Sequence, residues 1–87
     1  MKQNPDFLLR TVADSLVLVP VGKAAEKFPG MISINDTSVF LWERLAEDQT
    51  EDSLTHALLE KYDVNEQKAR EDVQNFLRTL TAIEAVL

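Results

Sequence analysis

The fold of this chain is decided by one stretch, Gly30-Met31-Ile32-Ser33-Ile34-Asn35-Asp36-Thr37-Ser38-Val39-Phe40-Leu41-Trp42, in which strand composition gives way directly to a helical pattern. Met31–Ile34 has the composition of a short strand, and Gly30 provides the break before it. Asn35 is a favourable N-cap, and Asp36 places a carboxylate at the positive end of the helix dipole. The stretch therefore predicts a strand followed at once by a helix. If that strand lies at the edge of a sheet, it can bind an extended peptide.

Two further strands are expected before this stretch. Phe7–Val12 and Leu16–Val21 both have strand composition, and Ala13-Asp14-Ser15 between them predicts a tight turn. The two runs therefore form a hairpin. The connection Gly22–Pro29 follows as a loop, in which a helical turn is expected at Ala24–Glu26.

Three helices are expected after Asn35. The first covers Asp36–Ala46, the second follows the cap Thr50, and the third follows the cap Asn65 and ends near Ala82. The residues that mark their buried sides by helical spacing are Val39, Phe40, Trp42 and Leu45 in the first helix, Leu54, Ala57, Leu58 and Tyr62 in the second, and Ala69, Val73, Phe76, Leu77 and Leu80 in the third. Residues 83–87 remain as a tail that packs or pairs.

This order of elements predicts an α+β fold of the winged helix-turn-helix type, in which a three-stranded antiparallel sheet is followed by three helices. The 87 residues form a single domain, 1–87, because a chain of this length cannot build two independent cores.

Composition excludes several classes of function. The net charge of −6 disfavours general nucleic-acid affinity, which requires neutralisation of phosphates. The absence of cysteine excludes disulfides and thiolate metal sites and is compatible with a reducing cytoplasm. There is no signal-peptide core and no apolar run long enough to cross a bilayer, so we expect a cytoplasmic protein that does not act at a membrane.

No set of catalytic side chains is recognisable. His56 is the only histidine, and it has neither a carboxylate pair nor a hydroxyl partner nearby in the sequence. We therefore expect a protein that is not an enzyme and that needs no metal or cofactor. A winged-helix DNA-binding regulator is the alternative, but Glu66, Glu71 and Asp72 offset the basic residues of the third helix.

The chain resembles the PqqD-like family over nearly its whole length. The segments that carry the likeness, in order, are Val12-Ala13-Asp14, Val17-Leu18-Val19-Pro20, Gly30–Thr37, Phe40-Leu41-Trp42, Tyr62-Asp63-Val64 and Asp72–Leu77. The family's usual close has a small residue or Gly after the last helix. Here 82–87 contains no Gly, which leaves the conformation of the tail open.

The resemblance implies a winged-helix peptide chaperone. Members of the family recognise the leader of a ribosomally made precursor peptide and present it to a modifying enzyme, commonly of the radical S-adenosylmethionine (SAM) type; in the founding member the final product is pyrroloquinoline quinone (PQQ). The leader adds as an extra strand beside the third strand, in a groove lined by the third helix. The matching positions expected to bind the peptide are Met31, Ile32, Ser33, Ile34, Ala69, Arg70, Val73 and Phe76.

Competing interpretations of these positions stay open. Val73 and Phe76 at helical spacing are also typical of a plain core, and Arg70 is also typical of a solvated helix charge. The edge of the third strand can equally be closed by the chain's own tail, or can pair with a second copy, so a monomer or a weak homodimer is expected.

Overall fold

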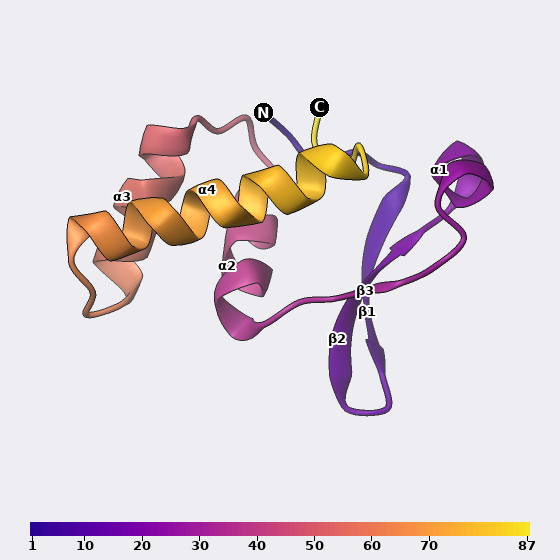
Figure 1. The fold of residues 1–87 in the computed structure, drawn as a ribbon, viewed down its shortest axis with the longest axis horizontal. Helices are drawn as coiled ribbons and strands as arrows, with labels where there is room; N and C mark the ends of the chain where they lie inside the picture. The colour runs from indigo at the N-terminus through magenta and orange to yellow at the C-terminus, as the bar shows by residue number, and fades with distance from the viewer.

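The computed structural model describes all of residues 1–87 and contains a three-stranded sheet and four helices. Figure 1 shows a layer of helices above the sheet, with the two chain ends close together. The sheet is antiparallel with the order β1-β2-β3, so β3 is an edge strand. The predicted α+β class is confirmed, with one helix more than expected, because a full helix forms in the connection before the third strand.

The first two strands form the expected hairpin. β1 covers Phe7–Val12 and β2 covers Ser15–Pro20, and Val12 pairs with Ser15. The turn therefore contains only Ala13 and Asp14, which both have positive φ (50° and 68°), as a two-residue hairpin turn of type I′ requires. The predicted turn was one residue too long, because Ser15 already belongs to β2. Figure 1 shows the tip of this hairpin projecting away from the helices.

The segment after β2 contains a helix and a very short strand. α1 covers Gly22–Lys27, and the helical turn expected at Ala24–Glu26 lies within it. β3 covers only Ile32–Ser33, which is shorter than the predicted Met31–Ile34. The backbone N–H of Ile34 still donates to the carbonyl oxygen of Leu16 at 3.0 Å, so the connection to β2 extends one residue beyond the strand.

The three long helices begin where their caps predict. α2 covers Asp36–Arg44, α3 covers Glu51–Lys61 and α4 covers Glu66–Ala82. The side chains of Asn35, Thr50 and Asn65 accept hydrogen bonds from the backbone N–H three residues later, at 2.8, 3.0 and 2.8 Å. Each cap satisfies one of the free N–H groups of a helix start. None of the helices has the length and apolar character needed to cross a membrane.

One hydrophobic core joins the helices to the sheet. Its fully buried leucines are Leu18, Leu41, Leu45, Leu54, Leu58 and Leu80. In α2 the buried side is formed by Leu41 and Trp42, and it continues to Leu45 at the C-cap, whereas the predicted Val39 and Phe40 are only half-buried. Trp42 is a core residue. In α4 the buried residues are Ala69, Val73, Phe76 and Leu80, as the spacing predicts, with Leu77 half-buried.

The C-terminal tail turns back at Glu84 and pairs with the start of the chain. The N–H groups of Glu84 and Ala85 donate to the carbonyl oxygens of Thr81 and Leu80, which is the Schellman pattern. Beyond it, Lys2 and Leu87 exchange two backbone hydrogen bonds, and the N–H of Asn4 donates to the oxygen of Ala85. The tail therefore does not pair with β3, and the idea that it closes that edge is wrong.

We expect Glu84→Gly to stabilise the protein. Glu84 has φ of 60°, a left-handed conformation that costs a residue with a Cβ about 1–2 kcal/mol. Glycine avoids this cost, but its more flexible unfolded chain offsets part of the gain. The free energy of unfolding, measured by urea denaturation, should rise by about 0.5–1 kcal/mol.

Glu84→Ala is the matched control, because it keeps the Cβ and removes only the carboxylate that meets the ammonium of Lys27 at 3.3 Å. This variant should show no gain. An equal gain in both variants would mean that the side-chain charge, and not φ, limits stability here.

Candidate functional site

The outer edge of β3 carries unpaired backbone groups. In an antiparallel ladder, residues alternate between those whose N–H and C=O face the neighbouring strand and those whose groups face away. Ile34 faces β2, because its N–H bonds to Leu16. Ser33, one residue earlier and paired opposite Val17, therefore directs its N–H and C=O away from β2. This edge is free to accept another strand.

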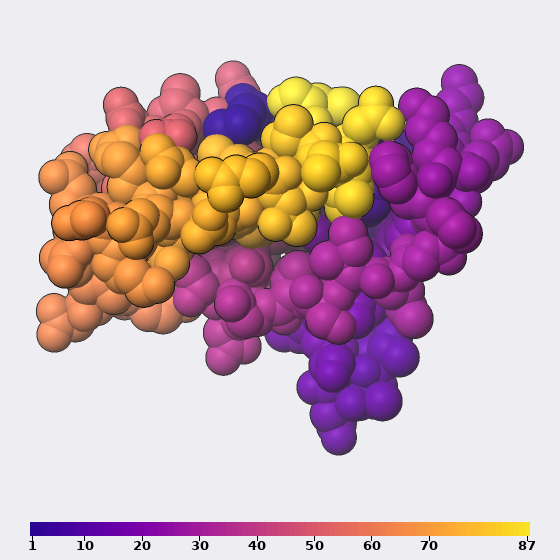
Figure 2. All heavy atoms as spheres, in the orientation of Figure 1, coloured from indigo at the N-terminus to yellow at the C-terminus, as the bar shows by residue number.

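A groove of about 530 Å³ lies beside this edge. One wall is formed by β3 and the first turn of α2, and the other wall is formed by α4. The lining residues are Ile32, Ser33, Ile34, Asn35, Thr37, Ser38 and Leu41 on the first wall, and Lys68, Asp72, Asn75, Phe76, Thr79 and Leu80 on the second. In Figure 2 the orange and yellow surface of α4 borders the magenta surface of the first wall.

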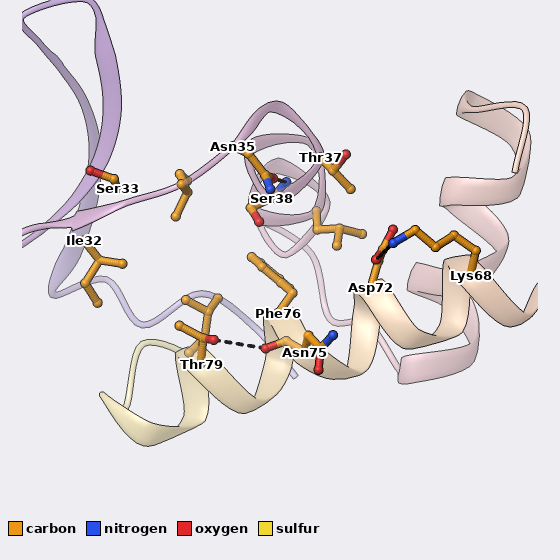
Figure 3. A pocket seen from close by; sticks show the side chains of 13 residues that line it. Ile32, Ser33, Asn35, Thr37, Ser38, Lys68, Asp72, Asn75, Phe76 and Thr79 are labelled. Carbon is orange, nitrogen blue, oxygen red and sulfur yellow. Dashed lines mark hydrogen bonds and ion pairs between the residues drawn. The ribbon is translucent and has the colours of Figure 1, made fainter.

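The α4 wall follows from helical spacing. Asp72, Asn75, Phe76 and Thr79 are three or four residues apart, so they form one stripe on the surface of the helix. This stripe lies next to the buried stripe and shares Phe76 with it, because Phe76 is buried and also lines the groove. Figure 3 shows Phe76 directed from α4 toward the first wall, between Thr79 on one side and Asp72 on the other.

The two ends of the groove differ in chemistry. At the end beside β3, most of the lining is apolar and consists of Ile32, Ile34, Phe76 and Leu80, with the side chain of Thr79 beside them. At the end beside the start of α2, Lys68 and Asp72 form an ion pair, with Nζ and Oδ1 separated by 2.9 Å. The hydrogen bond with Asp72, together with the charge of that carboxylate, raises the pKa of Lys68. The groove therefore combines an apolar end with a charged end.

Four of the residues predicted from the sequence meet in this groove. Ile32, Ser33, Ile34 and Phe76 all line it. Met31 lies just before β3 with 57% of its surface exposed, and it does not line the groove.

The remaining predicted residues lie elsewhere, which corrects the expected outline of the groove. Ala69 and Val73 are fully buried in the core. Arg70 lies on the opposite flank of α4, where its guanidinium meets Asp52 at 2.9 Å and Glu51 at 3.1 Å. The hydrogen bonds that Arg70 donates to Asp52 and to Glu51 raise its pKa. These three residues lie on other sides of α4 than the one that faces the groove: Ala69 and Val73 face the core, and Arg70 faces α3.

Sequence reasoning missed the polar part of the lining, which includes Asn35, Thr37, Ser38, Lys68, Asp72, Asn75 and Thr79. Helical periodicity identifies two polar flanks beside the buried stripe of α4, one with Arg70 and Gln74 and one with Asp72 and Thr79. The sequence alone contains no signal that says which flank faces β3. The i,i+4 spacing of Lys68 and Asp72 predicts an ion pair, but it does not predict that this pair lies in the groove.

Comparisons with known proteins agree with this architecture. The model of a protein family described as coenzyme PQQ synthesis protein D (PqqD) matches residues 15–86. The structure is similar to one described as TbiB1 in complex with the TbiA(beta) leader peptide, with a TM-score of 0.76, 20% sequence identity, and coverage of 98% of this chain and 93% of that chain. It is also similar to lasso peptide synthetase B1 complexed with the leader peptide, with a TM-score of 0.70, 18% identity, and coverage of 93% and 89%. No curated protein matches the chain at a significant level.

We expect Arg70→Gln to destabilise the α3–α4 contact modestly. The variant removes a guanidinium that is shared by Glu51, Asp52 and Glu66, of which the last lies at 3.9 Å. Partly exposed pairs contribute little, so the free energy of unfolding should fall slightly in urea denaturation at low salt, and by less at high salt. Arg78→Gln is the control, since Arg78 contacts only the side-chain oxygen of Asn75. Equal losses in both variants would contradict the role of the acidic partners.

Proposed function

Because the chain belongs to the family of coenzyme PQQ synthesis protein D, we propose that it is a peptide chaperone that binds the leader of a ribosomally made precursor peptide. The observation that carries this proposal is the unpaired outer edge of β3 beside the groove. The leader adds to the edge as a fourth strand and places alternate side chains over α4. Both solved structures that resemble this chain are described as complexes with a leader peptide, which supports the proposal.

The expected affinity follows from the size of the edge. Ser33 offers one N–H and one C=O, and a bonded backbone pair contributes roughly 1 kcal/mol net. These few hydrogen bonds are too weak by themselves for stable binding. Apolar side chains of the peptide that enter the groove beside Phe76 and Leu80 add about 25 cal/mol of binding free energy per Å² of buried apolar area. After the cost of ordering a disordered leader, the dissociation constant is on the order of micromolar. That strength suits a protein that passes its peptide on.

The proposed role is recognition and delivery without catalysis. The groove is lined by Lys68 and Asp72 as its only charged side chains, and these two are paired with each other. We propose that the enzyme receiving the peptide is of the radical SAM type, as the family's link to PQQ synthesis suggests, and that the exchange takes place in the cytoplasm.

The DNA-binding alternative is not favoured by the charges of α4. A recognition helix needs basic side chains free to meet phosphates and bases. Here Lys68 is paired with Asp72, and Arg70 is paired with acidic residues of α3, so only Arg78 has no acidic partner.

Ser33→Pro should abolish most peptide binding without unfolding the protein. Proline removes the N–H that faces the free edge, and it fits an edge strand because this N–H is not used by β2. Peptides selected from a displayed library of random dodecamers serve as probes. Their dissociation constants, measured by fluorescence polarisation, should rise at least tenfold. The variant loses the hydrogen bond from the backbone N–H of residue 33, and the proline ring also obstructs the approach of the peptide to the edge.

Ser33→Ala is the matched control, because it keeps the backbone N–H and removes only an exposed hydroxyl. Its affinity should stay within about twofold of the wild type. In amide spectra of the wild type, the selected peptides should shift Ile32–Ile34 and Asn75–Leu80. Shifts confined to residues 47–52, or equal affinity of the proline variant, would contradict binding at the β3 edge.

The genomic locus tests the partner. We expect a gene for a short precursor peptide and a gene for a radical SAM enzyme beside the gene of this protein, because carrier, cargo and enzyme act together. Sequencing of the locus is the first measurement. The second is co-purification of the encoded enzyme with the peptide-loaded protein. A locus that encodes a precursor and a different class of modifying enzyme would remove the radical SAM assignment and leave peptide binding intact.

A further inference from the structure

The repeat of α4 along the groove matches the repeat of an extended peptide. Leu80, Phe76 and Asp72 are four residues apart, which is about 6 Å along a helix. Alternate side chains of a strand are about 6.7 Å apart. A peptide that lies along β3 and α4 therefore places three alternate side chains opposite Leu80, Phe76 and Asp72 in turn. Figure 3 shows Phe76 on α4 between Thr79, which lies toward the β3 end, and Asp72, which lies near Thr37 of α2.

These three positions do not offer the same chemistry. The places opposite Leu80 and Phe76 share the groove with Ile32 and Ile34 of the other wall, which makes them mainly apolar. Thr79 also lies at this end, but its hydroxyl already donates to the backbone oxygen of Asn75. The place opposite Asp72 is bordered by the polar side chains of Thr37 and Ser38 in α2. An alternating peptide thus meets two apolar places and then one polar place.

Asp72 is able to bind a positive side chain without losing its present partner. Its Oδ1 accepts the hydrogen bond from Lys68, while no protein group donates to Oδ2. The carboxylate is the less exposed member of the pair, with 31% of its side chain exposed, against 60% for Lys68. A guanidinium can donate to Oδ2 while Lys68 stays in place, and such charge-assisted bonds are the strong ones.

The opposite charge fits this place poorly. An acidic side chain at this place would lie beside the carboxylate of Asp72, and the single positive charge of Lys68 would have to serve both carboxylates. Arg78, the next basic residue along α4, already donates to the side chain of Asn75. The net charge of −6 adds a long-range preference for a basic ligand.

We propose that the groove selects a peptide segment in which a basic side chain, bound by Asp72, precedes two apolar side chains at alternate positions. The order follows if the peptide adds antiparallel to β3, as β1 and β2 and also β2 and β3 pair in this sheet and as the more stable kind of pairing. Because β3 runs toward α2, the N-terminal part of the peptide then lies at the Asp72 end and its C-terminal part at the Leu80 end. This specificity rests on the proposed function, because it concerns the same groove. Asp72 is thereby a specificity-determining residue, and Lys68 holds its carboxylate in position.

The test uses the displayed library of random dodecamers on the full chain. Peptides enriched on the wild type should show the spacing basic, any, apolar, any, apolar. A synthetic peptide with this pattern is then compared with its citrulline analogue, which keeps the shape of arginine and removes the charge. Fluorescence polarisation should show that the citrulline peptide binds the wild type with a five- to tenfold larger dissociation constant than the arginine peptide.

The variants separate the role of Asp72 from that of net charge. On Asp72→Asn the arginine and citrulline peptides should bind equally. Asp52→Asn is the matched control, because it removes the same charge from a carboxylate that lies on the other flank, paired with Arg70. This variant should keep the full preference for arginine.

The outcomes distinguish the two proposals. Apolar residues at alternate positions with no basic preference, with an acidic preference, or with a preference that survives Asp72→Asn would overturn the specificity and leave peptide binding in place. Enrichment of no peptide, or of peptides that ignore Ser33→Pro, would overturn the proposed function and the specificity together.

Discussion

The backbone pairing between the C-terminal tail and residues 2–4 is the interaction on which the groove depends. The last helix ends near β3, and the tail that follows carries apolar residues of its own. The tail turns at Glu84, buries Ala85, and exchanges its hydrogen bonds with Lys2 and Asn4 instead of with β3. Its donors and acceptors are thereby satisfied elsewhere, and the edge of β3 keeps its own free.

α4 organises the rest of the molecule through three distinct flanks. Its buried stripe, with Val73 and Leu80, holds the core. The flank with Arg70 meets the acidic start of α3, and the flank with Asp72 and Thr79 forms one wall of the groove. Because one rigid helix carries all three, the wall of the groove is positioned by the same packing that stabilises the fold. A backbone edge and a fixed helical wall are sufficient for recognition of an extended chain, with no reactive side chain required.

Much of the fold was readable because its signals are local. Asn35, Thr50 and Asn65 are caps whose bonds reach only three residues, so the starts of the three long helices were predicted correctly. β1 was predicted with its observed bounds, because its composition and the turn at Ala13 and Asp14 are also local. The β3 strand was overestimated. β2 is long enough to lie opposite all of residues 31–34, but the chain joins β2 only at Ile32, and no local pattern encodes that point.

Caps, turns and periodicity act within a few residues, so the class of the fold, the starts of the long helices, the buried stripe of α4 and a short strand before Asn35 follow from the amino-acid sequence. Which polar flank of α4 faces β3 depends on long-range packing, and that packing places Asp72 and not Arg70 in the groove. The two flanks have similar composition, and their assignment follows from the side of α4 on which α3 packs. The path of the tail was decided in the same way, because its partner lies at the other end of the chain.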